Sequence, residues 1–134
     1  MKGALATLLT ATALAAAAPV TAHHSFAAEY DAMKPVTLTG RVTRIELTNP
    51  HAHMFVDVKD DNGTMTRWTI ELASPKVLAQ YGWRTGALKV GDDVSVEGAM
   101  AKDGSTSANA RIVTLADGRR LYAGSSGGDL PPQH

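Results

Sequence analysis

The residues best suited to chemistry in this sequence are its histidines. Four of the five histidines fall in two short clusters, His23-His24 and His51-Ala52-His53. Imidazole changes protonation near neutral pH and is the commonest protein ligand for transition metals. The sequence has no cysteine, so a metal site would depend on nitrogen and oxygen ligands. We therefore take His23, His24, His51 and His53 as candidate metal ligands.

The first 22 residues decide what His23 can do. They combine Lys2, an uncharged Ala- and Leu-rich run from Gly3 to Ala18, and small residues up to Ala22. This layout is typical of a secretory signal peptide. A transmembrane anchor is the alternative, but the run is shorter than the roughly 20 apolar residues that a span needs. We predict cleavage after Ala22, a periplasmic or secreted protein, and no membrane span after cleavage.

Cleavage after Ala22 would make His23 the first residue of the working chain. Its α-amine and its imidazole both lose protons near neutral pH, and together they can chelate one ion. Nitrogen ligands of this kind bind Cu(II) most tightly among the common divalent ions, so copper is the predicted metal and zinc the second choice. The predicted role is binding of the metal, its delivery or tolerance towards it, and not turnover. A copper oxidoreductase is a lower-ranked alternative.

Composition excludes several other functions. Thirteen Lys and Arg balance thirteen Asp and Glu, which argues against a nucleic-acid or anionic-membrane partner. The absence of cysteine excludes disulfides and a cysteine nucleophile. No G-x-S-x-G, phosphate-binding loop or H-E-x-x-H motif occurs. The sequence therefore gives no direct support for an enzyme.

Alternating apolar and polar residues predict strands after an extended N-terminal arm at residues 23–35. The period of two begins at Val36. A bulge near Thr43-Arg44 would return Ile45 and Leu47 to the core side. In the next predicted strand, Met54 faces inward while His51 and His53 share the opposite face.

Turn and cap residues divide the rest of the chain. Asn62-Gly63 predicts a hairpin turn, and Ser74-Pro75 predicts the start of a short helix that Gly82 can end. Further strands are expected at 94–100, at 108–115 and through Leu121 and Tyr122. The Gly-, Ser- and Pro-rich tail at 124–134 is expected to be disordered.

Three strands, a helix and two more strands predict an all-β fold. We expect a small five-stranded OB-like barrel over residues 36–123, with its one short helix between strands three and four. The aromatic residues Trp68, Tyr81 and Trp83 could stack on a sugar or base, but core packing is the favoured interpretation. The acidic residues are interpreted as ordinary surface charges: Glu29, Asp31, Asp57, Glu71 and Glu97.

Several segments are similar to a family of small exported bacterial proteins of unknown function. They include A-H-H-S-F-A-A-E-Y-D, T-N-P-H-A, W-x-x-E-L-x-S-P and G-D-x-V-x-V-E-G. The resemblance implies export and a β-rich domain and supplies no activity. His23, His24 and His51 match the family pattern. The family more often has Trp at the position of His53, which makes His53 the least favoured ligand.

Two functions follow from these patterns. The favoured hypothesis is an exported barrel that binds copper through the N-terminal histidines and those of the second strand. The alternative is a metal-free module of the cell envelope that binds a protein, peptide or glycan.

Overall fold

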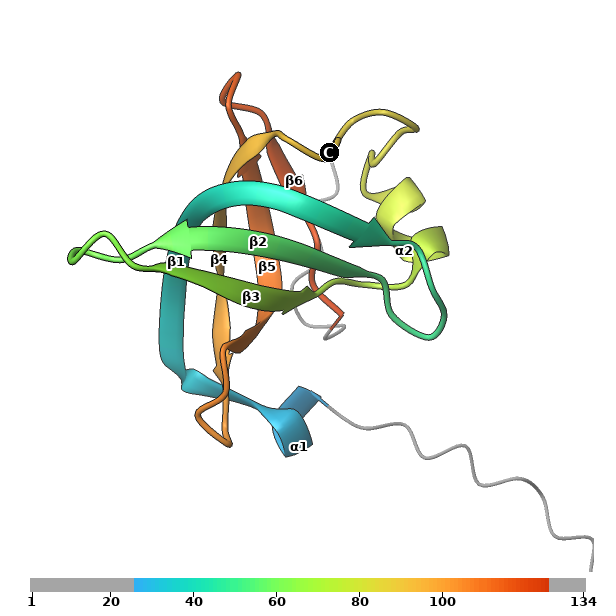
Figure 1. Ribbon diagram of the computed structural model, residues 1–134. Coiled ribbons are helices and arrows are strands. Elements are labelled where there is room, and N and C mark those ends of the chain that lie inside the picture. Colours follow the sequence, from blue (N-terminus) through green and yellow to red (C-terminus); the bar gives the residue numbers. More distant parts are fainter. Residues whose placement is uncertain (1–25, 126–134) are drawn as a thin grey trace, which may run out of the picture.

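Six strands and two short helices make up the fold (Figure 1). The computed structural model describes residues 26–125. In chain order the elements are α1 (Phe26–Glu29), β1 (Tyr30–Glu46), β2 (His53–Lys59), β3 (Met65–Glu71), α2 (Pro75–Gln80), β4 (Asp93–Ala101), β5 (Ser107–Leu115) and β6 (Arg120–Tyr122). The predicted signal peptide, His23, His24 and residues 126–134 of the predicted tail lie outside the described residues.

The strands close into a barrel. The sheet order is β3-β2-β1-β4-β5-β6, and β3 also pairs with β5 in parallel, so β1, β2, β3, β5 and β4 form a ring. β6 is added to β5 outside this ring. A ring of five strands with a helix between the third and the fourth is the OB-like barrel expected from the sequence. The predicted fold class is confirmed.

The strand β1 is long and pairs with two different strands of the barrel, β4 and β2. Its first part pairs with β4 and its last part with β2, and Figure 1 shows it curving between them. The register shifts between Val42 and Arg44, which confirms the predicted bulge. However, β1 begins at Tyr30, paired with Ala101, so residues 30–35 are barrel wall and not a free arm. Pro35 falls at a second register shift, where its missing N–H is tolerated.

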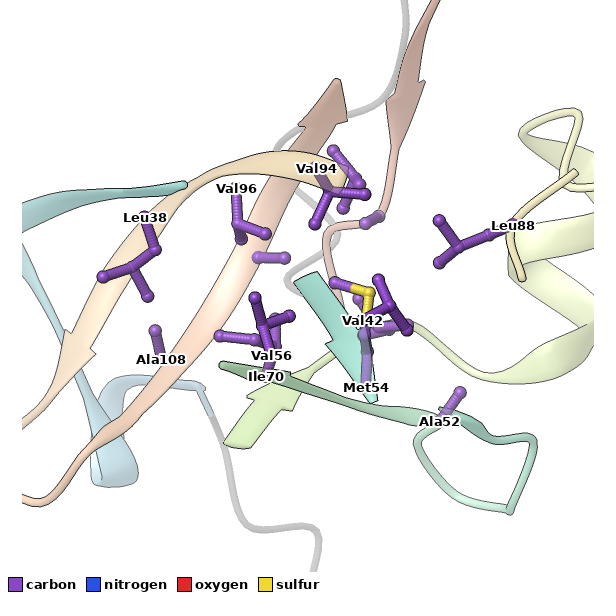
Figure 2. Close-up of a cluster of buried hydrophobic side chains, with 14 of the residues drawn as sticks. Leu38, Val42, Ala52, Met54, Val56, Ile70, Leu88, Val94, Val96 and Ala108 are labelled. Atoms are coloured by element: carbon purple, nitrogen blue, oxygen red, sulfur yellow. The ribbon is translucent and has the colours of Figure 1, made fainter. Parts of the chain in front are cut away.

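Apolar side chains from all five ring strands fill the barrel. Figure 2 shows them converging, among them Leu38, Met54, Val56, Ile70 and Val96. Met54, Val56 and Ile70 are fully buried, as their inward parity predicts. Leu47 was expected in the core, but it follows the end of β1 and is 67% exposed.

The helix α2 lies beside the C-terminal end of β1 (Figure 1). Ser74 caps it by accepting a hydrogen bond from the Val77 N–H at 3.3 Å, and Gly82 follows with φ +93°. Leu78 on α2 is buried in the core. Trp68, Tyr81 and Trp83 pack partly buried against the same core, which confirms core packing for these aromatic residues.

Among residues 26–125, no helix has the length and apolar character needed to cross a membrane.

Candidate functional site

The carboxylate of Glu71, at the end of β3, is the centre of the candidate site. The neighbouring Ile70 and Leu72 point into the core, so Glu71 lies on the outer face of the barrel wall. It is nevertheless only 7% exposed. One carboxylate oxygen, Oε2, accepts a hydrogen bond from the Tyr30 hydroxyl, and the other, Oε1, lies 2.5 Å from His51 Nδ1.

The prediction that Glu71 is an ordinary surface charge is therefore wrong. Its parity was interpreted correctly, because the side chain does leave the barrel wall on the outer side. The N-terminal part of β1 and the loop before β2 bring Tyr30 and His51 over it. Burial of a carboxylate is tolerated because both of its oxygens have hydrogen-bonding partners. By contrast, Asp57 and Glu97 are surface charges as expected, paired with Arg67 and Arg120.

His51 is held by the loop that joins β1 to β2. The peptide bond between Asn49 and Pro50 just before it is cis, and the Thr48 hydroxyl donates to the His51 carbonyl at 2.9 Å. Ala52 then pairs through its backbone with Leu72 and Ala73. The Glu71 contact favours a proton on Nδ1. Nε2 has no partner among residues 26–125, and about a third of the side chain (32%) is exposed.

Tyr30 connects this site to the start of the described chain. Its ring stacks on Phe26 with the centroids 5.8 Å apart, and it is 8% exposed. Burial raises the pKa of the Tyr30 phenol far above its ordinary value, and the hydrogen bond to Glu71 raises it further. Lys102 fixes the segment before Tyr30 through its N–H to Glu29 O at 2.8 Å and its Nζ to Ala27 O at 2.5 Å.

His53 lies on the same outer face. It is the register partner of Glu71 on β3 and of Glu46 on β1. Directly opposed residues of antiparallel strands have Cβ atoms about 5 Å apart, so His53 is a neighbour of the Glu71–His51 pair. No hydrogen bond or ion pair of the His53 side chain occurs within residues 26–125.

Asn109 on β5 continues the line of register partners formed by His53 on β2 and Glu71 on β3. It is the parallel register partner of Glu71 and is 3% exposed. Its Nδ2 donates to Ser125 Oγ at 2.6 Å. Glu71 and Asn109 are the two buried polar or charged residues of the described chain, and they lie side by side at the β3–β5 closure of the barrel.

The described residues do not form a complete metal site. Between Phe26 and Ser125, no group of three or more His, Asp or Glu side chains is placed to hold an ion. The structure brings His51 and His53 to one face of the barrel, while His23 and His24 lie outside the described residues. A site with three or four nitrogen ligands would therefore need ligands from outside residues 26–125.

Sequence reasoning missed Tyr30 and Glu71 as site residues. The period of two placed Glu71 on the outer face, where an acidic residue needs no explanation, and the extended arm gave Tyr30 no contact. One signal was available. Tyr30, His51 and Glu71 each lie in one of the segments that carry the family resemblance, A-H-H-S-F-A-A-E-Y-D, T-N-P-H-A and W-x-x-E-L-x-S-P.

Comparisons with known proteins give a family and a structural likeness. Residues 11–110 match a family described as of unknown function, DUF6152. No curated protein matches the sequence significantly. Among solved structures, the mitochondrial single-stranded DNA binding protein Rim1 from S. cerevisiae is similar with a TM-score of 0.48 and 15% identity, over 62% of this chain and 93% of that chain.

Proposed function

The chain belongs to the DUF6152 family of unknown function, and from its own site we propose that it is an exported, periplasmic protein that binds a transition metal. Copper is the proposed ion and zinc the second choice. His51 contributes one ligand, Nε2. His23 and His24 contribute the others, with the α-amine of His23 as a chelating partner once the leader has been removed.

One observation carries this proposal: the 2.5 Å contact between His51 Nδ1 and the buried Glu71 carboxylate. A metal-binding histidine almost always donates its second ring N–H to a carboxylate or a carbonyl, which fixes the tautomer and the ring orientation. Here that partner is present, and it is itself held by Tyr30. The ring is thus oriented with Nε2 available on the side away from Glu71.

The path of the chain supports a role for the N-terminal histidines. Tyr30 and His51 bind the two oxygens of one carboxylate, so the start of β1 lies next to His51. Phe26 stacks on Tyr30, and His24 precedes Phe26 by two residues, a reach of about 7 Å. The residue to which the N-terminal histidines are joined, Phe26, is therefore held beside the site.

The ligand types favour copper. An α-amine and three imidazoles form an all-nitrogen set, for which Cu(II) has the highest affinity in the divalent series. His53, as the strand neighbour of Glu71, is the fourth candidate histidine. Because one chelate ring involves the chain end, correct processing is part of the proposed site.

The test is titration with Cu(II) of protein whose first residue, His23, has been verified by mass spectrometry. We expect saturable binding of one ion per chain by calorimetry. Ligand at 100 times its Kd should stabilise the fold by about 2.7 kcal/mol. His51→Ala should weaken binding at least tenfold, and Glu71→Gln should weaken it by roughly 10- to 100-fold, as expected for loss of an orienting partner.

Two matched controls isolate the proposed ligands. His134→Ala removes the one histidine that is not a candidate and should leave the affinity unchanged. One extra alanine before His23 keeps every side chain but moves the α-amine away, and it should weaken binding as His51→Ala does. Absence of saturable binding by the processed protein would refute the proposal. Partner binding that survives replacement of His23, His24 and His51 by alanine would favour the envelope-module alternative.

A further inference from the structure

A groove runs along the outer barrel wall between α1, the first part of β1, and the strands β4 and β5. Its volume is about 270 Å³, and its lining includes Phe26, Pro35, Val36, Ala99, Asn109 and Arg111. Gly98 of β4 lines the groove without a side chain. Its backbone lies so close to β5 that a Cβ on residue 98 would be 2.0 Å from Asn109 O. The groove therefore combines apolar side chains and one aromatic wall with the polar side chains of Thr37, Glu97, Asn109 and Arg111.

The charge at the groove is unbalanced. Glu97 lines it, but its carboxylate already accepts from Arg120 at 2.9 Å. The guanidinium of Arg111 forms no ion pair with any residue from Phe26 to Ser125. A segment that fits the groove should therefore be apolar and should carry one negative charge for Arg111.

The described chain ends beside this groove. After β6 the backbone continues along β5, with the Ala123 N–H donating to Arg111 O at 2.9 Å. Ser125 then accepts the Asn109 side chain, and Asn109 lines the groove. Ser107, Ala108 and Asn109 of β5 already pair with β3. The chain therefore cannot continue to pair with this edge of β5 after Ser125. Ser125 therefore lies next to a residue of the groove lining.

We propose that the groove is the docking site of the chain's own C-terminal segment, residues 126–134. This segment reads S-G-G-D-L-P-P-Q-H. Asp129 pairs with Arg111, and Leu130-Pro131-Pro132 packs on Pro35, Val36 and Phe26. Asp129 is four residues from Ser125, a reach of about 14 Å, whereas Asn109 and Arg111 are about 7 Å apart along β5.

Proline suits this role. A Leu-Pro-Pro sequence favours the extended polyproline conformation, so it loses little conformational entropy on docking. Such segments bind in shallow grooves that have aromatic walls, which Phe26 supplies. Phe26 also stacks on Tyr30, so the docked segment would contact the residue that anchors the N-terminal part of the chain. The inference does not depend on metal binding.

The experiment uses the metal-free full chain with a nitroxide on Gln133→Cys, since the sequence contains no other cysteine. We expect strong paramagnetic broadening of the amide signals of Val36, Ala99 and Arg111. A nitroxide on Asn62→Cys, in the turn after β2, is the control and should leave these signals sharp. The single swap Arg111→Glu should reduce the broadening, and adding Asp129→Arg should restore it.

Two outcomes would overturn the inference. One is broadening of Val36 and Ala99 by the Gln133 label that is no greater than the broadening by the Asn62 label. The other comes from a mixture of spin-labelled chains and isotope-enriched chains that carry no spin label. If the amide signals of the isotope-enriched chains broaden, the segment docks on a second copy of the chain. Copper binding is measured on separate samples, so failure here leaves the proposed function untouched, and the reverse also holds.

Discussion

Replacing Tyr30 by phenylalanine removes a single oxygen atom from the centre of the candidate site. The aromatic ring and its stacking on Phe26 remain. What changes is that Glu71 Oε2 loses its donor while the side chain stays 7% exposed. A hydrogen bond to a charged group contributes about 1.5–3 kcal/mol, so Tyr30→Phe should lower the free energy of unfolding by about 2 kcal/mol at pH 7.

Urea unfolding measures this change. The midpoint should fall while the m-value stays constant, because the surface exposed on unfolding is unchanged. Tyr122→Phe is the matched control. Tyr122 is partly buried, and its hydroxyl makes no hydrogen bond within residues 26–125, so this variant should stay within about 0.5 kcal/mol of the parent.

The difference in unfolding free energy between Tyr30→Phe and the parent should also depend on pH. The pKa of the Tyr30 phenol is raised in the folded protein, whereas in the unfolded chain it is about 10. Above pH 10 the folded state therefore binds more protons than the unfolded state, and stability falls as the pH rises, by up to about 1.4 kcal/mol per pH unit. The phenylalanine variant lacks this contribution, so the stability difference between the two proteins should be full below pH 10 and shrink above it.

Two results would contradict this reasoning about the Tyr30–Glu71 contact. The first is equal stability of Tyr30→Phe and the parent protein at pH 7. The second is a difference that stays constant from pH 9 to pH 12, because Tyr30 would then titrate in the folded state as it does in the unfolded chain.

Two further pairs of substitutions test the barrel. Gly98→Ala puts a Cβ 2.0 Å from Asn109 O and should lower the free energy of unfolding by about 3 kcal/mol or more. The control is Gly63→Ala, whose Cβ meets nothing closer than 3.6 Å. It should lower the free energy of unfolding by only about 1–2 kcal/mol, because residue 63 has a positive φ. Met54→Ala empties a fully buried position and should cost about 2–5 kcal/mol in urea unfolding, while Met65→Ala, 57% exposed in the parent, should be nearly neutral. Equal effects within either pair would contradict the packing described.

The sequence by itself determined the local elements. The period of two set which side chains of β2 and β3 face the core, and the parity change after Val42 revealed the bulge in β1. Ser74-Pro75 set the start of α2. These features depend on backbone geometry and on neighbours a few residues apart, so a short window of sequence contains the information.

Only the tertiary structure decided which polar residues form the site. Tyr30 and Glu71 are 41 residues apart in the chain. Strand parity gave the side on which Glu71 leaves the barrel wall, but it carried no information about what covers that side. The covering comes from ring closure, which pairs β1 with β4 from Tyr30 onward and places the N-terminal segment and His51 over the end of β3. Burial of a charge depends on such distant contacts, because only they remove water from it and supply its hydrogen bonds.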